Sequence, residues 1–368
     1  MKKKSVLLRA YLNHNLGDDL FVYTICNRYP NTHFYIIGTK DNSHNLKNIS
    51  NLTYWSEDSF WFKLLNKGYK IDCKLRHKPV CNIRNIVFTN MLCRFFKYNV
   101  LISGSYFTQP AYWTVNDDNT WYSHHPYILG CNFGPYKTPE YLEYHKEKFK
   151  LATQVCFRDE FSYNMFSDID IVEQSTDIVF NLPVESINDN GEIVISVVNL
   201  NKDDSQINKY SDMYIDKVAL LVNHLLANNK SVRLMSFCDH QGDLDVIFAI
   251  LSKVDKPDSV LVSSYEKDGL VRSLEILRNC HSIIATRYHA MILGLLFNKE
   301  VFPIVYDKKI IQVIESIGYT GKYVTVSNLD SFNPCDVDDY FYKMDSSKLN
   351  DCIIEAKKQF RLLDVELN

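Results

Sequence analysis

The sequence lacks the short motifs that mark several common classes of protein. Its ten cysteines include no C-x-x-C pair, and most lie in apolar runs, which favours buried free thiols in a reducing compartment over disulfides or a zinc site. Lysine and arginine (41) do not exceed aspartate and glutamate (44), so the overall charge does not indicate a nucleic-acid-binding protein. The loop after the first apolar run is not G-x-G-x-x-G, so a dinucleotide-binding fold is not indicated.

The N-terminal residues also lack the pattern of a targeting segment. Lys2–Lys4 precede an apolar run at Ser5–Leu8, but Arg9 interrupts the run and residues 13–19 are polar. The run is too short for a signal peptide or a membrane span. We therefore predict a soluble cytoplasmic protein.

The chain is long enough for two domains of ordinary globular composition. It has 368 residues, 46% of them hydrophobic and 23% charged. β-type apolar runs lie at residues 5–12, 33–39, 99–103, 127–133 and 154–157. Helical stretches are expected from about residue 18, over 86–98 and over 139–152. Turn residues at 188–191 then precede a second α/β series, which opens at 192–200.

This alternation predicts an α/β fold with two Rossmann-like domains that face each other across a cleft. The expected boundaries are residues 1–185 for the N-terminal domain and 191–330 for the C-terminal domain. Residues 336–368 read as an amphipathic helical tail, an unspecific candidate for contact with a membrane surface.

The stretch from Ser282 to Lys309 carries the most chemistry. A β-type run ends at Thr286, an apolar helical stretch starts at His289, and a second β-type run follows at 301–306. Arg287 and His289 therefore lie at a strand-to-helix turn, where open α/β sheets bind ligands and a helix N-terminus attracts anions. Arg287 offers a planar fork to a carboxylate or phosphate, and histidine ordinarily titrates near neutrality. This pattern predicts an anion site with an acid–base residue. The alternative is a surface arginine with a capping or packing histidine.

An aromatic loop at residues 106–126 follows the 99–103 strand. It contains six bulky aromatic residues, including Trp113 and Trp121, among Asn and Asp. A long loop after a strand end is often functional. Two interpretations stay open: the rings form a wall for a sugar, or they pack the loop down. The adjacent His124 and His125 point apart and have no Cys or His partners at ligand spacing, so no metal site is predicted.

Several separated motifs, between Asn15 and about Gly318, resemble those of the polysaccharide pyruvyl transferase family. The matching segments are N-x-G-D at 15–18, G-x-x-x-G-P at 130–135, R-D-x-x-S at 158–162, an acidic loop with Gln241, Asp243 and Asp245, and R-x-H-A at 287–290. Two segments depart from the family pattern. Ser103-Gly104-Ser105 replaces a run of three glycines, and Lys308 stands where proline is usual in Y-D-P-K.

The resemblance implies a GT-B-like enzyme that transfers pyruvate from phosphoenolpyruvate to a hydroxyl pair on a sugar, forming a ketal. The acceptor would be a precursor of a surface polysaccharide such as an exopolysaccharide or capsule, either lipid-linked or not, and would lie between the aromatic loop and the second domain. No cofactor or metal is expected beyond the donor. We expect three catalytic residues: His289, Arg287 and Asp18. We expect nine substrate-binding residues: Arg158, Tyr288, Lys309, Asn15, Gly17, Gly104, Ser105, Trp113 and Gln241.

In this interpretation His289 gives and takes the proton, and Asp18, Asp159 or an aspartate of the acidic loop accepts a hydroxyl proton. Alanine at Arg287 or His289 would abolish transfer and leave the fold intact. Two rivals remain. One is a GT-B glycosyltransferase that uses a nucleotide sugar. The other is a non-catalytic protein that binds a sugar or anion in a degenerate site.

Overall fold

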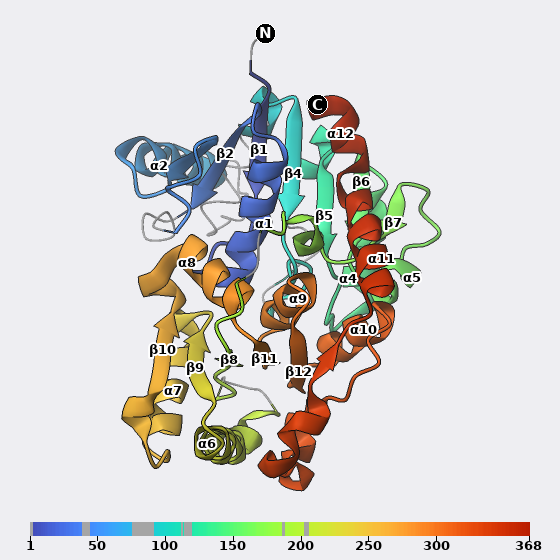
Figure 1. The fold of residues 1–368 in the computed structure, drawn as a ribbon. Coiled ribbons are helices and arrows are strands. Elements are labelled where there is room, and N and C mark those ends of the chain that lie inside the picture. Colours follow the sequence, from blue (N-terminus) through green and yellow to red (C-terminus); the bar gives the residue numbers. More distant parts are fainter. Residues whose placement is uncertain are drawn as a thin grey trace. The chain divides into compact units, whose positions relative to one another are not determined.

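The structure is a computed structural model that describes residues 3–38, 45–75, 92–111, 113, 120–185, 188–201 and 206–368. It contains two sheets of seven strands, each accompanied by helices (Figure 1). No helix among these residues is long and apolar enough to cross a membrane.

The first sheet is entirely parallel, with the strand order β3-β2-β1-β4-β5-β6-β7. Its strands are β1 (Ser5–Arg9), β2 (His33–Gly38), β3 (Leu52–Ser56), β4 (Tyr98–Ile102), β5 (Tyr127–Cys131), β6 (Gln154–Phe157) and β7 (Val172–Gln174). The expected runs give β1, β2, β4, β5 and β6. The sequence reading missed β3 and β7, which form the two edges of the sheet.

Among the described residues up to 185, this sheet is accompanied by the helices α1 (Leu16–Arg28), α2 (Phe60–Leu75), α4 (Pro139–Phe149) and α5 (Glu160–Asn164). Short 3-10 helices lie at Cys93–Phe95, Thr120–His124 and Ile178–Asn181. The expected helix over 86–98 lies outside the described residues up to residue 91. Leu92 is helical as expected. From Cys93 on the expectation is wrong, because Cys93–Phe95 is a 3-10 turn and Tyr98 already begins β4.

The second sheet has the order β10-β9-β8-β11-β12-β13, and β14 pairs antiparallel with β12. Its strands are β8 (Glu192–Val197), β9 (Ser231–Ser236), β10 (Val260–Ser264), β11 (Ser282–Ala285), β12 (Glu300–Val305), β13 (Val324–Thr325) and β14 (Tyr342–Lys343). Its helices are α6 (Ser211–Ala227), α7 (Asp243–Leu251), α8 (Tyr265–Asn279), α9 (Tyr288–Leu296), α10 (Lys308–Ser316) and α11 (Ser346–Ala356). 3-10 helices lie at Asn208–Tyr210, Asp239–Gln241, Pro257–Ser259, Val326–Ser331 and Pro334–Tyr340.

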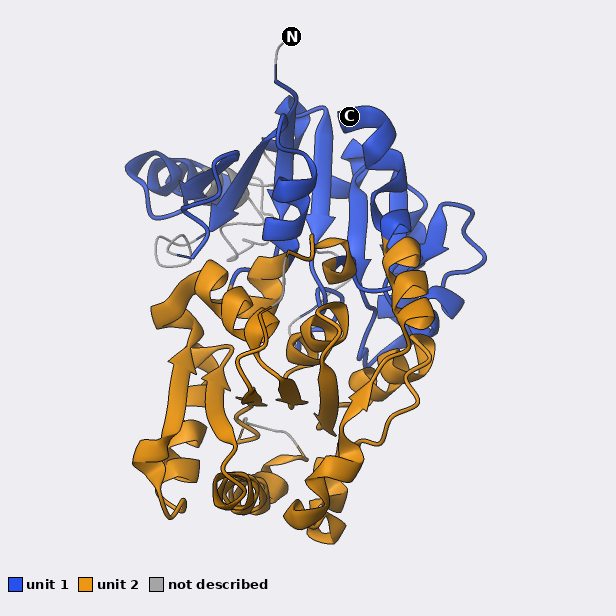
Figure 2. Ribbon diagram, in the orientation of Figure 1, with its two compact units in different colours: residues 1–12, 21–178, 357–368 blue, residues 13–20, 179–356 orange. Residues whose placement is uncertain are grey.

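The chain divides into two compact units (Figure 2). Unit 1 comprises residues 1–12, 21–178 and 357–368, and unit 2 comprises residues 13–20 and 179–356. This division differs from the expected boundaries at two places. Residues 13–20 group with unit 2, where the Leu16 N–H donates to the Phe237 carbonyl at 3.0 Å. The tail divides between the units, so it does not form a third segment.

The last residues pack into unit 1 as the 3-10 helix Lys357–Phe360 and α12 (Arg361–Leu367). Gln359 is fully buried, accepts from the Gly130 N–H at 2.8 Å and donates to the Thr176 carbonyl at 3.1 Å. An amphipathic pattern shows that a helix buries one face, but it does not show which core receives that face.

Each unit has its own apolar core. The core of unit 1 is rich in aromatic rings, among them Phe107, Phe133, Phe149 and Phe166. The core of unit 2 is mostly aliphatic and lies among β8, β9 and the helices that cover them. Of the cysteines described as free thiols, seven are buried and Cys335 is exposed, which confirms the prediction of buried free thiols.

Candidate active site

The turn between β11 and α9 carries Arg287 and His289. Arg287 has an extended backbone and stands immediately before the first helical residue, Tyr288. The backbone N–H groups of Thr286 and Arg287 both donate to the hydroxyl of Ser196, at 3.1 Å each. Ser196 lies in β8, the strand beside β11. A side chain of the neighbouring strand therefore fixes this turn at the carboxyl end of the sheet.

The Arg287 guanidinium already holds a carboxylate inside unit 2. Its Nε donates to Oδ2 of Asp243 at 3.0 Å, and its Nη2 pairs with Oδ1 of the same residue. Its Nη1 donates to the Gln241 side-chain oxygen at 2.8 Å. Burial alone would lower the pKa of Arg287, but the charge and hydrogen bonds of Asp243 outweigh burial and raise it. Arg287 stays cationic, and this pairing offsets much of its charge.

Asp243 also organises the loop that follows β9. It is fully buried, and its Oδ2 accepts from the backbone N–H groups of Phe237 at 3.1 Å and Cys238 at 3.0 Å. Together with the Arg287 contact, these bonds join the β9–α7 loop to the β11–α9 turn. The acidic loop expected from the sequence therefore lies beside the R-x-H-A motif, and Gln241 and Asp243 make the contact.

The imidazole of His289 lies against the first turn of α1. A Cβ atom placed on Gly17 would lie 2.0 Å from His289 Nδ1, far inside any real contact distance. Any residue larger than glycine would displace the ring or the helix. The N-x-G-D and R-x-H-A motifs, which are distant in sequence, thus meet within unit 2. The space that the glycine leaves open is filled by His289.

Asn15 builds the start of α1. Its side-chain oxygen accepts from the Gly17 N–H at 2.9 Å, and its carbonyl accepts from the N–H groups of Asp18 and Asp19. This is the hydrogen-bonding pattern of a helix N-cap, which explains the asparagine without a substrate. Asp18 lies half-buried in the first turn.

Asp19 is a carboxyl group of unit 2 whose pKa is clearly raised. It was not identified from the sequence. It is 2% exposed, and the Tyr265 hydroxyl donates to its Oδ2 at 2.6 Å. Burial raises its pKa to about 7; the Tyr265 hydrogen bond works against this and Asp18 adds to it. The only signal in the sequence was a second aspartate after N-x-G-D, and nothing pointed to Tyr265.

Other polar side chains gather at the ends of the same strands. Asp239 accepts from the hydroxyls of Ser236 and Ser264, at the ends of β9 and β10. The rings of His14 and His240 lie 4.4 Å apart. The Tyr288 ring packs edge-on against His289 at 4.8 Å. Lys309 lies in the first turn of α10, just past the end of β12, and its N–H donates to Asp307.

A second arginine cluster lies in unit 1, at the end of β6. Arg158 is buried; its Nη1 pairs with Asp177 at 2.9 Å and its Nη2 donates to the Asn132 side-chain oxygen at 2.9 Å. The Ser105 hydroxyl donates to the same Asn132 oxygen at 3.3 Å. A Cβ atom on Gly104 would lie 2.9 Å from Arg158 Nη1. The structure therefore brings the predicted residues Arg158, Gly104 and Ser105 together.

The remaining part of R-D-x-x-S has a structural explanation. Asp159 caps α5 by accepting from the Ser162 N–H at 2.7 Å, and it also accepts from the Ser162 hydroxyl at 3.0 Å. The hydroxyl oxygen of Ser162 accepts from the Phe133 N–H at 2.8 Å. Asp159 is buried, which fits a cap better than a base for a substrate hydroxyl.

The described part of the aromatic loop mostly packs inward. Phe107, Trp121 and Tyr122 are buried in the core of unit 1. Trp113 is half-buried and packs edge-on against Tyr141 and Tyr144 of α4. Residues 112 and 114–119 lie outside the described residues. For the buried rings, the interpretation that the aromatics pack the loop down is confirmed.

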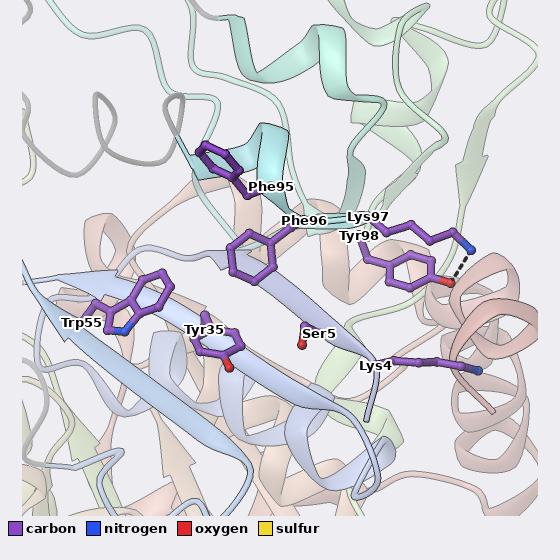
Figure 3. Close-up of a pocket in the computed structure, with 8 residues that line it drawn as sticks. All are labelled: Lys4, Ser5, Tyr35, Trp55, Phe95, Phe96, Lys97 and Tyr98. Carbon is purple, nitrogen blue, oxygen red and sulfur yellow. Dashed lines mark hydrogen bonds between the residues drawn. The ribbon is translucent and has the colours of Figure 1, made fainter. Parts of the chain in front are cut away.

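A groove of about 490 Å³ lies elsewhere on unit 1 (Figure 3). Lys4 and Ser5 at the start of β1, and Tyr98 at the start of β4, place part of it at the amino edge of the sheet. Its other lining residues are Tyr35, Trp55, Phe95, Phe96 and Lys97. Arg158 follows the carboxyl end of β6, so the groove and the arginine cluster mark opposite edges of one parallel sheet. Among the described residues, no group of three or more His, Cys, Asp or Glu side chains could hold a metal ion.

Comparisons with known proteins agree with this fold. Residues 15–308 match the sequence model of a family described as polysaccharide pyruvyl transferase. No curated protein matches the sequence. Anabaena Alr3699/HepE in complex with UDP-glucose has a TM-score of 0.53 at 8% identity, over 99% of this chain and 98% of that chain. Its complex with UDP and glucose gives 0.52 at 8% identity, over 98% and 95%. These likenesses confirm the predicted α/β fold with two Rossmann-like domains of the GT-B type.

Proposed function

Because the chain belongs to the polysaccharide pyruvyl transferase family, we propose that it transfers pyruvate from phosphoenolpyruvate to a pair of sugar hydroxyls on a surface-polysaccharide precursor. The observation that carries the proposal is the contact between Gly17 and His289. It joins two family motifs around one imidazole in the first turn of α9, and the half-buried Asp18 follows Gly17 in the first turn of α1. An acid–base group next to an anion-attracting helix end is what this chemistry requires.

The reaction moves two protons and, at carbon 2 of the donor, forms two bonds and breaks two, one of which is the π bond to the methylene carbon. One proton is added to the methylene carbon of phosphoenolpyruvate, and the two sugar oxygens form bonds to carbon 2. The bond from carbon 2 to the phosphate oxygen breaks. Of the two hydroxyl protons, one balances the proton that completes the methyl group, and the other leaves with the phosphate. No oxidant, metal or further cofactor enters this balance.

We assign the methylene proton to His289, since its ring can donate a proton and later accept one. A carboxylate of α1 accepts a hydroxyl proton in this scheme. Asp18 is our original choice, and Asp19 is an alternative because its raised pKa is close to the operating pH that favours acid–base catalysis.

Arg287 has a more restricted role than the sequence indicated. Asp243 and Gln241 accept from three of its five N–H groups. One N–H group on each terminal nitrogen is left to donate to an oxygen of phosphoenolpyruvate. We therefore propose that Arg287 holds the α9 turn in place and adds one or two hydrogen bonds to the substrate. Arg158, which pairs with Asp177 through Nη1, holds the turn at the end of β6 in this scheme.

The test measures phosphate released from phosphoenolpyruvate with a panel of sugars that carry free hydroxyl pairs. The variant is His289→Gln, and the matched control is His281→Gln, an exposed histidine of unit 2. We expect release to fall at least about a hundredfold in His289→Gln, the usual range for loss of a general acid–base group, and to stay unchanged in the control. Equal activity in both variants would contradict the assignment of His289.

A nucleotide-sugar donor is the second candidate, because the fold resembles a protein solved with UDP-glucose. Thermal unfolding with each ligand shows which of the two donors the protein binds. A ligand at a hundred times its dissociation constant stabilises the native state by about 2.7 kcal/mol, which is readily measured as a shift in Tm. We expect the shift with phosphoenolpyruvate. A shift with UDP-glucose alone would make this protein a glycosyltransferase.

A further inference from the structure

Helix α2 (Phe60–Leu75) of unit 1 exposes an unusual amount of apolar surface. It follows the edge strand β3 in the sequence, and Figure 1 labels the helix itself. Six of its large apolar side chains are between 46% and 74% exposed: Phe60, Trp61, Leu64, Leu65, Ile71 and Leu75. Single exposed apolar residues are ordinary, but a contiguous group of this kind marks an interaction surface.

The spacing of these residues places them on one side of the helix. Phe60, Leu64, Ile71 and Leu75 are separated by four, seven and four residues, so their side chains point in nearly the same direction. Trp61 and Leu65 are also four residues apart and widen the same stripe. We call these six residues the apolar stripe of α2.

Four lysines form a second stripe. Lys63, Lys67, Lys70 and Lys74 follow one another at intervals of four, three and four residues, and all four are exposed. At 100° per residue this stripe borders the apolar stripe on the side of Phe60. The remaining side faces the protein, since Asn66 is buried and Phe62 is half-buried. The helix is therefore attached by one side and presents an apolar and a basic side to its surroundings.

We propose that α2 docks unit 1 onto an anionic lipid bilayer. Aromatic and aliphatic side chains beside a row of lysines are the composition of helices that lie in the interface of a membrane, with the apolar side in the acyl boundary and the cations among the headgroups. The four exposed lysines of α2 form a row of cations, which complements an anionic surface. A neutral protein groove would explain the apolar stripe and leave the lysines unexplained.

The C-terminal tail exposes fewer large apolar side chains than α2, namely Ile354 and Val365. Large apolar residues of the tail, namely Leu349, Phe360, Leu363 and Leu367, are buried in the units. The proposal does not depend on which donor the enzyme uses. It explains how an enzyme of polysaccharide assembly would meet an acceptor carried on a lipid.

The test is flotation of the full-length protein with two kinds of vesicle. One consists of phosphatidylcholine alone, and the other contains about 30% of the anionic lipid phosphatidylglycerol. We expect binding to the anionic vesicles, and weaker binding at 1 M salt, where screening shortens to about 3 Å. Phe60→Ser/Trp61→Ser/Leu64→Ser should abolish binding. Replacing all four stripe lysines by glutamine should weaken it at least about tenfold, since each basic residue near such a surface contributes several-fold.

Matched controls come from unit 2. Leu220→Ser/Phe248→Ser removes two exposed apolar side chains, and glutamine at Lys230, Lys253, Lys256 and Lys267 removes the same charge as the stripe variant. Neither control should change flotation. Binding that these controls weaken as much as the α2 variants do, or no binding of the wild type to anionic vesicles, would overturn the proposal. Concentration-dependent dimerisation that the serine variant abolishes, without vesicle binding, would assign the stripe to a second copy of the chain instead.

Discussion

At the scale of single residues, close packing explains two glycines that the sequence offered as ligand contacts. Gly17 faces the His289 imidazole at a distance that excludes a side chain, and a Cβ atom on Gly104 would require the Arg158 guanidinium to shift. In both cases a motif glycine makes room for the functional side chain of another motif. The glycines therefore position the functional groups, and direct contact with substrate is not needed to explain them.

Gly17→Ala should impair catalysis because its Cβ would displace the His289 ring. A displacement of about 1 Å at a catalytic group costs on the order of a hundredfold in rate, and we expect a loss of that size in kcat. The clash should also lower Tm. Gly68→Ala in α2 is the control, since a Cβ there meets nothing within 4 Å. In a His289→Ala background the same Gly17→Ala change should cost little stability, and an equal cost in both backgrounds would contradict the contact.

Asp19 should make stability depend on pH. Its pKa is raised to about 7, so the folded protein keeps a proton that the unfolded chain loses near pH 4. Its favourable contribution is complete below pH 4 and is lost as pH rises through 7, a change of roughly 4 kcal/mol. Asp19→Asn should therefore raise Tm at pH 8 and change it little at pH 4. Asp212→Asn, at an exposed position in α6, should show no such difference; identical pH profiles for wild type and Asp19→Asn would refute the prediction.

At the scale of elements, the Arg287–Asp243 pair joins two loops at the carboxyl edge of the second sheet. Arg287→Ala would leave the Asp243 carboxylate buried without its cation, and breaking a buried pair in this way costs about 3–5 kcal/mol. We therefore expect this variant to unfold at lower urea concentration than the wild type. The earlier expectation that it leaves the fold intact disagrees with this geometry.

Two further variants test the pairing. Arg287→Ala/Asp243→Asn removes the unpaired charge and keeps a side-chain oxygen for the N–H groups of Phe237 and Cys238, so it should be more stable than Arg287→Ala alone. Arg272→Ala breaks an exposed pair with Glu275 and should cost less than about 1 kcal/mol. Urea unfolding that is unchanged in Arg287→Ala would show that the pair does not hold these loops.

The secondary-structure elements were only partly predictable from the sequence. Hydrophobic periodicity and β-branched runs located β6 to the residue, four other strands of the first sheet, and β8, β11 and β12 of the second sheet, because these runs are apolar. β3 was missed because all five of its residues are only half-buried, so no clear apolar pattern marks it. At the site, motifs indicated Arg287, His289 and Gln241. They could not reveal that Asp243 pairs with Arg287 or that Tyr265 meets Asp19, since these contacts depend on the tertiary fold.

At the scale of the whole molecule, the chain passes between its two units four times. Residues 13–20 belong to unit 2, although α1 continues into unit 1, and residues 357–368 belong to unit 1. Neither unit is therefore a continuous piece of sequence. A segment near the N-terminus packs against His289. Helical residues near the C-terminus pack in unit 1. Separate expression of residues 179–356 would lose the Gly17 and Asp19 contacts.

The C-terminal segment should accordingly stabilise unit 1. Phe360 is fully buried and packs edge-on against Tyr29 with ring centres 5.9 Å apart, while the Arg28 guanidinium lies 4.8 Å from its ring centre. Arg28 also pairs with Asp364 at 2.5 Å. Phe360→Ala should cost about 3–5 kcal/mol, as truncation of a buried aromatic does.

The measurement is thermal unfolding of Phe360→Ala beside Val365→Ala. Val365 lies in the same segment and is 81% exposed, so its truncation should leave Tm within error of the wild type. If only unit 1 is destabilised, its unfolding transition should move to lower temperature. The transition of unit 2 should stay in place, because each unit has its own core. If Phe360→Ala unfolds like Val365→Ala, the last residues do not contribute to the core of unit 1, and the expected independent tail would be the better description.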